Sequence, residues 1–263
     1  MTSNSETQPL ILITNDDSVH AKGIKVLTTI AREFGDVVVV APETNSSGLS
    51  QSLTMSRPLR VRKILEQEGL HIYACDGTPT DCVKLGSQHF CPRKPNLILS
   101  GINHGSNSSI NILYSGTMGA VIEATANGFD AIGFSLLNHS TDADFTPGIP
   151  YIKEIIAKVL QHGLPDDVSL NVNIPDLPAE ELKGIRVCRE AKAAWTDSFE
   201  ERHDPAGRPY WWLTGEFVCN DKDPNTDEGA LCQGYVSVVP VHPDYTCFEA
   251  IPTIKELFNT SER

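Results

Sequence analysis

Several motifs and all long apolar stretches are missing from this sequence, and these absences narrow its possible functions. The chain of 263 residues has no C-x-x-C, no H-x-x-x-H and no Walker loop ending in G-K-[ST]. That argues against a zinc module and against a P-loop nucleotide site. No apolar run approaches the ~18 residues that cross a bilayer, and residues 1–9 lack the apolar core of a signal peptide. We therefore expect a cytoplasmic protein with no membrane partner.

Cations are scarce, and the number of cysteines is odd. The sequence has 21 lysines and arginines against 34 aspartates and glutamates, so the net charge is −13 and the pI is near 5.0. Such a surface repels phosphate backbones, so polymeric nucleic acid is not expected as a stable partner. A bound cation would still allow a small anionic substrate. Irregularly spaced cysteines fit a reducing compartment better than a disulfide framework. They are Cys75, Cys82, Cys91, Cys188, Cys219, Cys232 and Cys247.

The composition is that of an ordinary globular protein, and its N-terminal part has a β-α-β pattern. Residues 10–13 form a continuous apolar run, which predicts a strand buried on both faces. Apolar residues recur at helical spacing over residues 24–34, with Gly35 as the predicted C-cap. Residues 37–41 predict a second buried strand. This order predicts an α/β fold with a parallel sheet covered by helices on both faces.

The same rhythm continues to residue 174 and then stops. Further strands are expected at residues 97–99, 131–134 and 169–174, the last closing the main sheet, and helices at residues 118–126 and 152–160. After Pro175, proline, glycine and aromatic residues increase, and strands are expected at residues 211–218 and 235–241 with an acidic loop at 220–229. We therefore divide the chain into an α/β catalytic core over residues 8–175 and a β-rich extension over residues 176–263. We expect the extension to be an arm exchanged between subunits.

Three polar clusters directly follow predicted strands. They are Asn15-Asp16-Asp17, residues 45–48 and residues 100–103. Ligands bind at the carboxyl edge of open parallel sheets, so these clusters are expected to meet at one site. His20 and His104 are near the clusters in sequence and could assist proton transfer, although solvated loop histidines are the commoner interpretation.

Asp16 and Asp17 are adjacent carboxylates at the end of a buried strand. Two ionised carboxylates there cost free energy unless a cation compensates them, and oxygen ligands suit Mg, Mn or Ca. An isolated Asp pair more often caps a helix or lies in a solvated turn. The coincidence of three polar clusters at strand ends favours the metal site.

The stretch Ser115-Gly116-Thr117 opens a predicted helix. Backbone N–H groups at a helix N-terminus attract anions, and the two hydroxyls add donors, so this turn is a candidate phosphate cradle. Taken alone, it would more often be an ordinary N-cap. Residues 77–82 form a second turn that opens a helix, where Thr80 or Asp81 can serve as a cap.

These motifs resemble the signature of the SurE family, the survival-protein 5'-nucleotidases. The resemblance is carried by ITNDD at residues 13–17, Ala41-Pro42 leading to Ser47-Gly48, GTPTDCVK at residues 77–84, SGINHGSN at residues 100–107 and YSGT at residues 114–117. The motifs occur in family order, and the similarity covers nearly the whole chain, from about residue 10 to residue 252. Several co-linear motifs are far more specific than a lone pair of aspartates.

The resemblance implies a Rossmann-like three-layer core and hydrolysis of nucleoside 5'-monophosphates, or of other small phosphate esters, as homodimers or homotetramers. It implies one divalent cation, Mg, Mn or Ca, on ligands that match Asp16, Asp17, Ser47 and Asn103. Residues assigned to phosphate binding are Asn107, Ser115, Gly116 and Thr117. The nucleophile is expected to be a metal-activated water, and no side chain is assigned as general acid.

Two positions depart from the family pattern. Ser18 stands where the family usually has glycine after the acidic pair, which would strain the backbone if φ is positive there. Ser46 stands where a basic residue is frequent, which would alter how the substrate is met.

Two other functions have to be weighed against a metal-dependent phosphatase. A phospho-accepting receiver domain also has an acidic pair after its first strand, but it needs an aspartate after the third, where residues 100–103 have none. A haloacid-dehalogenase-like phosphatase uses an aspartate nucleophile in a D-x-D arrangement, whereas Asp16 and Asp17 are adjacent. Metal-assisted phosphomonoester hydrolysis is therefore the leading hypothesis.

Overall fold

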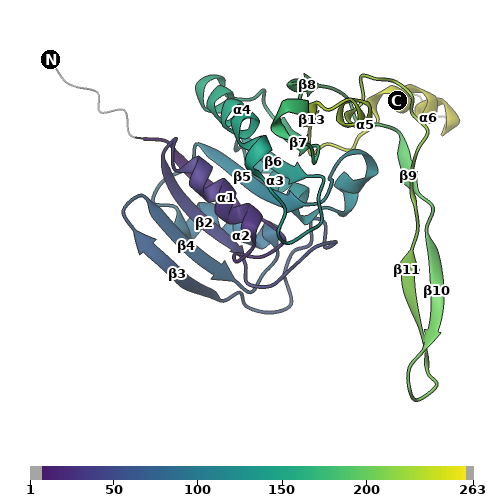
Figure 1. The fold of residues 1–263 in the computed structure, drawn as a ribbon, viewed down its shortest axis with the longest axis horizontal. Helices are drawn as coiled ribbons and strands as arrows, with labels where there is room; N and C mark the ends of the chain where they lie inside the picture. The colour runs from purple at the N-terminus through teal and green to yellow at the C-terminus, as the bar shows by residue number, and fades with distance from the viewer. Residues whose placement is uncertain (1–7, 259–263) are drawn as a thin grey trace.

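The computed structural model describes residues 8–258, in which a mixed sheet lies between two layers of helices (Figure 1). Nine strands of this part form the sheet, in the order β3-β4-β2-β1-β5-β6-β7-β13-β8. Their bounds are β1 Leu10–Thr14, β2 Asp36–Pro42, β3 Val61–Gln67, β4 Leu70–Cys75, β5 Leu97–His104, β6 Ala131–Leu136, β7 Ser169–Ile174, β8 Ile185–Val187 and β13 Val236–Val241. The α/β prediction is confirmed.

Alternation of side chains in the central strands separates two apolar cores. In β1, Ile11 and Ile13 pack with helices α1 and α4, whereas Leu10 and Leu12 pack with α2 and α3 on the opposite face. A strand covered on both sides has no polar face, which explains its continuous apolar run. The helices are α1 Lys22–Ala31, α2 Pro79–Leu85, α3 Gly116–Ala126, α4 Ile149–His162, α5 Asp227–Cys232 and α6 Ile251–Leu257. None of the helices described is long and apolar enough to cross a lipid bilayer.

The strands at the centre of the sheet are parallel. β1 pairs in parallel with β2 and with β5, and β6 continues the parallel order to β7. The carboxyl ends of β1, β2 and β5 therefore lie at one edge of the sheet. This register brings the three polar clusters of the sequence to neighbouring positions.

The prediction that residues 169–174 form the last strand of the main sheet was wrong. β13 pairs antiparallel with β7, and β8 then pairs in parallel with β13. Two strands from beyond residue 175 thus extend the core sheet across the predicted boundary. Local sequence does not reveal this, because the residues of a strand do not indicate which distant strand it will pair with.

The remaining strands build an arm that projects from the core (Figure 1). β10 (Ser198–His203) and β11 (Pro209–Thr214) form an antiparallel hairpin, and β9 (Ala193–Trp195) pairs with β12 (Phe217–Cys219) at its base. The single strand predicted over residues 211–218 is therefore two strands, interrupted at residues 215–216. The loop predicted at residues 220–229 is shorter, because α5 begins at Asp227.

Gly35 has a different function from the predicted helix cap. Helix α1 ends at Ala31 and has Arg32 as its C-cap. A Cβ on Gly35 would lie 2.1 Å from the carbonyl oxygen of Pro9, which immediately precedes β1. Glycine is required there because two backbone segments pass closely, which a helical pattern cannot indicate.

Ser18, in the turn after β1, has a φ of +107°. A non-glycine residue in this region costs about 1–3 kcal/mol, and the extra freedom of an unfolded glycine offsets about 0.5–1 kcal/mol of that. Ser18→Gly is therefore expected to raise the free energy of unfolding by about 1 kcal/mol, measured by urea denaturation. Ser50→Gly is the control, because Ser50 also has a positive φ but donates a hydrogen bond of 2.7 Å to the Leu113 carbonyl, whereas the Ser18 hydroxyl only accepts a longer one of 3.3 Å from the His20 N–H. A less stable Ser18→Gly protein would contradict the prediction.

Candidate active site at the carboxyl edge of the sheet

The loops after β1, β2 and β5 are hydrogen-bonded to one another. The Ser46 N–H donates to the carbonyl of Asp16 at 2.7 Å, and the His104 N–H donates to Oδ2 of Asp17 at 3.1 Å. Asp16, Ser47 and Asn103 line one cavity of about 470 Å³. Asp17 lines a neighbouring cavity, which Ser47 also lines. The structure thus brings the predicted metal ligands together around one point of the sheet edge.

Asp16 is the most enclosed of these residues. Only 3% of its surface is exposed, and the Thr117 hydroxyl donates to its Oδ1 at 2.6 Å. Burial raises the pKa of Asp16, and the nearby charge of Asp17 adds to this. The start of α3 packs closely against it, because a Cβ on Gly116 would lie 2.8 Å from the Asp16 Cβ. A buried carboxylate beside a second carboxylate is a site that a cation would stabilise.

Ser47 and Asn103 are positioned by local hydrogen bonds. The Ser47 N–H donates to Oδ1 of Asn45 at 2.8 Å, which holds the loop after β2 in a turn. The Asn103 amide nitrogen donates to the Gly105 carbonyl at 2.9 Å. The amide oxygen is then the Asn103 atom suited to a hard cation. Ser46, the second departure from the family pattern, is buried and does not line the cavity.

The four residues assigned to phosphate binding separate into two pairs. Ser115 and Asn107 line the cavity. Ser115 caps α3, because its hydroxyl accepts a hydrogen bond from the Met118 N–H at 3.0 Å. Asn107 is held by a residue distant in sequence instead, since its side-chain amide nitrogen donates to Ser135 Oγ at 2.8 Å. Gly116 and Thr117 are not among the lining residues, and the Thr117 hydroxyl is directed to Asp16. The structure therefore places these two behind the aspartate.

Sequence reasoning missed the far side of the cavity. The additional lining residues include Asn111, Tyr114, His139, Trp195, Phe217 and Glu228. Trp195 and Phe217 make an edge-to-face contact with ring centroids 5.6 Å apart, and the Trp195 indole N–H donates to Oδ1 of Asn111 at 2.8 Å. These aromatic residues come from the base of the arm, and no local pattern would assign them to the cavity.

The two histidines named from sequence lie at the neighbouring cavity. His20, His104 and Asp17 line it together, and His104 also reaches the main cavity. Nδ1 of His104 is 2.7 Å from the Ser140 carbonyl oxygen, so that nitrogen carries the hydrogen of the bond. His104 is therefore fixed in orientation by the loop after β6.

The donor set fits a hard divalent cation. Within residues 8–258, no group of three or more histidine, cysteine, aspartate and glutamate side chains is arranged to hold a metal. Two carboxylates, a hydroxyl and an amide oxygen form a site of another kind, one that suits Mg, Mn or Ca and not zinc. In the part of the chain that the structure describes, neither lysine nor arginine lines the main cavity. Lys22 and Lys25 line the neighbouring cavity that holds Asp17, so in the main cavity a bound cation would offset the repulsion between the carboxylates and an anionic ligand.

Comparisons with known proteins all point to one family. The family described as "Survival protein SurE" matches residues 11–197. A protein of Flavobacterium psychrophilum named "5'-nucleotidase SurE" is 51% identical over 94% of this chain and 97% of its own length. One of the same name from Caldanaerobacter subterraneus is 44% identical over 92% of this chain and 94% of its own. The crystal structure of the SurE protein from Aquifex aeolicus superposes with a TM-score of 0.82 at 40% identity, covering 95% of this chain and all of that one.

Proposed function

The chain belongs to the SurE family, and from this premise we propose that it is a divalent-metal-dependent 5'-nucleotidase that hydrolyses nucleoside 5'-monophosphates to nucleoside and phosphate. The resemblance inferred from the sequence motifs is confirmed. The predicted 5'-nucleotidase activity is also confirmed, because similar proteins carry that name. The identity of the metal, the ligand set and the assembly remain parts of the proposal.

One observation supports the metal dependence above all others. A phosphate monoester carries close to two negative charges near neutral pH, and the described lining of the main cavity includes Asp16 and Glu228 but neither Lys nor Arg; Lys22 and Lys25 line the neighbouring cavity. Asp16, Asp17, Ser47 and Asn103 would hold a single Mg, Mn or Ca ion. When bound, the cation supplies neutralisation of the phosphate and activation of water for in-line attack.

The protein's own residues position the ligands and the substrate. Thr117 fixes the Asp16 carboxylate through its hydrogen bond. Asn107 is held from its backbone by Oδ1 of Asn173 at 2.8 Å, so that it can meet the phosphate beside Ser115. Trp195 and Phe217 offer an apolar wall for the nucleoside and exclude water from that side. Binding both halves of the substrate places the phosphorus next to the metal ligands.

The test is a metal-by-nucleotide panel on metal-stripped protein. Phosphate release from AMP and GMP is expected to be negligible with chelator and to appear on addition of Mn, Mg or Ca. Equal turnover with and without chelator would contradict metal dependence. Turnover of no monophosphate with any of the three ions would contradict the nucleotidase assignment.

We also propose that the arm joins two or more copies of this chain as a homodimer or homotetramer. Large apolar side chains on the hairpin are exposed, with Phe199 at 68% and Leu213 at 63%, and these two residues pair across β10 and β11. An exposed apolar patch of this kind marks an interaction surface.

All seven cysteines are free thiols within the described residues, which supports the proposal of a reducing, cytoplasmic location.

Phe199→Ser combined with Leu213→Ser is expected to shift the assembly toward the monomer. Each replacement removes an apolar side chain that would be buried between subunits, worth about 1.5–3 kcal/mol when fully buried. Light scattering after size-exclusion chromatography measures the mass. The control is Glu201→Ser with Arg202→Ser on the same hairpin, which should leave the mass unchanged. A monomeric wild-type protein would contradict the proposal.

A further inference from the structure

Glu228 lines the proposed active-site cavity but has no part in the mechanism described above. It is a carboxylate at the start of α5, in the region beyond the predicted core. A second carboxylate facing a phosphate would weaken its binding by repulsion. Its presence in the lining is understandable if it faces a different part of the substrate, one that donates hydrogen bonds.

The Glu228 side chain is held in place by a specific partner. The Ser108 hydroxyl donates to its Oε1. A carboxylate has two oxygens and about four sites for incoming donors, so Oε2 can accept from a ligand. Burial raises the pKa of Glu228, and the charge of Asp227 adds to this, while the Ser108 hydrogen bond opposes it. An ionised carboxylate in such a place gains from a further hydroxyl donor.

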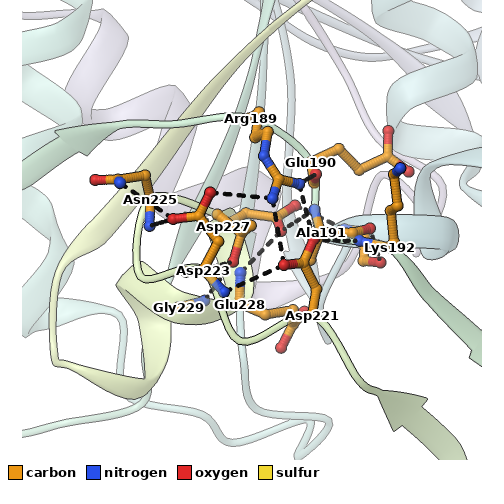
Figure 2. A network of polar contacts seen from close by, with 12 residues as sticks. Arg189, Glu190, Ala191, Lys192, Asp221, Asp223, Asn225, Asp227, Glu228 and Gly229 are labelled. Atoms are coloured by element: carbon orange, nitrogen blue, oxygen red, sulfur yellow. Dashed lines mark hydrogen bonds and ion pairs between the residues drawn. The ribbon is translucent and has the colours of Figure 1, made fainter.

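The backbone that carries Glu228 is also anchored. Asp227 is fully buried and accepts hydrogen bonds from the N–H groups of Ser109 at 2.7 Å and Ala191 at 2.9 Å. Figure 2 shows Asp227 and Glu228 within a polar network that continues through Asp221 and Asp223 to Arg189. A carboxylate fixed in this way is preorganised and loses little freedom when it binds a ligand.

Glu228 lines the same cavity as the proposed phosphate-binding residues and the aromatic wall. Its partner Ser108 directly follows Asn107, which is proposed to meet the phosphate. The 3-10 helix η2 (Ser109–Tyr114) then leads to Asn111, which holds Trp195. The Asn111 N–H donates to the Ser108 carbonyl at 3.2 Å, so these two residues lie within one turn of chain. Through Ser108, Glu228 is hydrogen-bonded to the segment that joins the proposed phosphate half to the aromatic wall, and a ribose would link these two halves.

We propose that Glu228 accepts a hydrogen bond from a ribose hydroxyl and so favours ribonucleotides over deoxyribonucleotides. This inference rests on the proposed function, because it assumes a nucleoside 5'-monophosphate in the cavity. Acidic side chains hold ribose hydroxyls in the same way in dinucleotide-binding folds, where a carboxylate offers an acceptor and the hydroxyl a donor. Glu228 is then a specificity residue that the core motifs do not include.

The test compares AMP with 2'-deoxy-AMP and 3'-deoxy-AMP. Wild-type protein is expected to show a kcat/KM for AMP about tenfold or more above that for at least one deoxy analogue, the range of a hydrogen bond to a charged acceptor. Glu228→Ala is expected to bring that ratio close to one. General damage to the fold would lower all three values together and leave the ratio unchanged. Glu228→Met, which keeps the length of the side chain but has no oxygen acceptor, serves if the alanine variant does not fold.

Glu190→Ala is the matched control, because it removes one neighbouring carboxylate that lines a different cavity. Its ratio is expected to equal that of the wild type. Equal kcat/KM values of the wild type for all three nucleotides would overturn the inference, as would an unchanged ratio in an active Glu228→Ala protein. p-Nitrophenyl phosphate, which has no ribose, separates the two possible failures. If the wild type hydrolyses neither it nor AMP with any divalent ion, the proposed function itself fails and the inference with it.

Discussion

Replacing Asp16 and Asp17 together by asparagine is expected to lower kcat/KM for AMP by about a thousandfold or more at saturating Mn or Mg. A bound cation contributes several kcal/mol to a phosphoryl-transfer transition state, and each 1.36 kcal/mol corresponds to a factor of ten. Asparagine keeps the volume of aspartate and an Oδ1 acceptor for the Thr117 hydroxyl. The loss would therefore come from missing charge, and phosphate release assays measure it directly.

Thermal unfolding of the metal-free proteins distinguishes lost chemistry from lost structure. The double variant is expected to melt at or above the wild-type temperature, because it removes a buried charge and its repulsion by a neighbour. The chain offers a matched control in Asp166 and Asp167, an adjacent and exposed pair before β7. Their replacement by asparagine should change neither activity nor stability appreciably. Wild-type turnover by the Asp16 and Asp17 variant would refute the metal site.

The second large effect is expected from Gly116→Ala. The added Cβ would lie 2.8 Å from the Cβ of Asp16, closer than real Cβ atoms approach, and 3.0 Å from its Oδ2, which is tighter than most real contacts. Either the aspartate or the start of α3 must shift, at a cost of about 1–3 kcal/mol in stability. Because a displacement of 1 Å near reacting groups can cost about a hundredfold in rate, activity should fall by at least that factor.

Gly148→Ala provides the control for this prediction. Gly148 is the N-cap of α4, and the nearest atoms to its added Cβ would belong to the Ile174 side chain, with Cδ1 at 3.1 Å and Cγ2 at 3.2 Å. That variant should keep its activity and lose little stability in urea denaturation. If Gly116→Ala matches it in both measurements, then Asp16 does not depend on the close approach of α3.

The core of the fold could be predicted because burial on both faces leaves a direct trace in the sequence. The run Leu10 to Ile13 is apolar at every position, and each of its residues is packed against one helix layer or the other. The polar residues that stop such runs mark the carboxyl edge, so the clusters that contain Asp16 and Asn103 were located by position, whereas the family resemblance singled out Ser47 and Asn103 as proposed ligands. Predictions were wrong where a contact between distant segments decided the structure, as at Gly35 and where β13 pairs with β7.

The part of the candidate site that lies at the ends of the central strands was predictable, and the rest was not. The metal-ligand candidates and the start of α3 follow strands whose parallel order is implied by the β-α rhythm. Thr117 was expected at phosphate, but its hydroxyl is bonded to Asp16. The sequence could not predict this contact, because it depends on the rotamer of Thr117 and joins two residues that are 101 positions apart. Family motifs locate such a residue without stating what it touches.

Local apolar patterning was sufficient to specify the central strands, their helices and the edge where Asp16, Ser47 and Asn103 meet. Tertiary structure alone decided that Trp195, Phe217 and Glu228 complete the cavity. Two hydrogen bonds hold this side of the cavity in place. One joins Asn111 to Trp195 across 84 residues, and the other joins Ser108 to Glu228 across 120 residues. Periodicity reports how a residue relates to its own helix or strand. It carries no information on contacts over such distances, which exist only once the arm and α5 have packed onto the sheet.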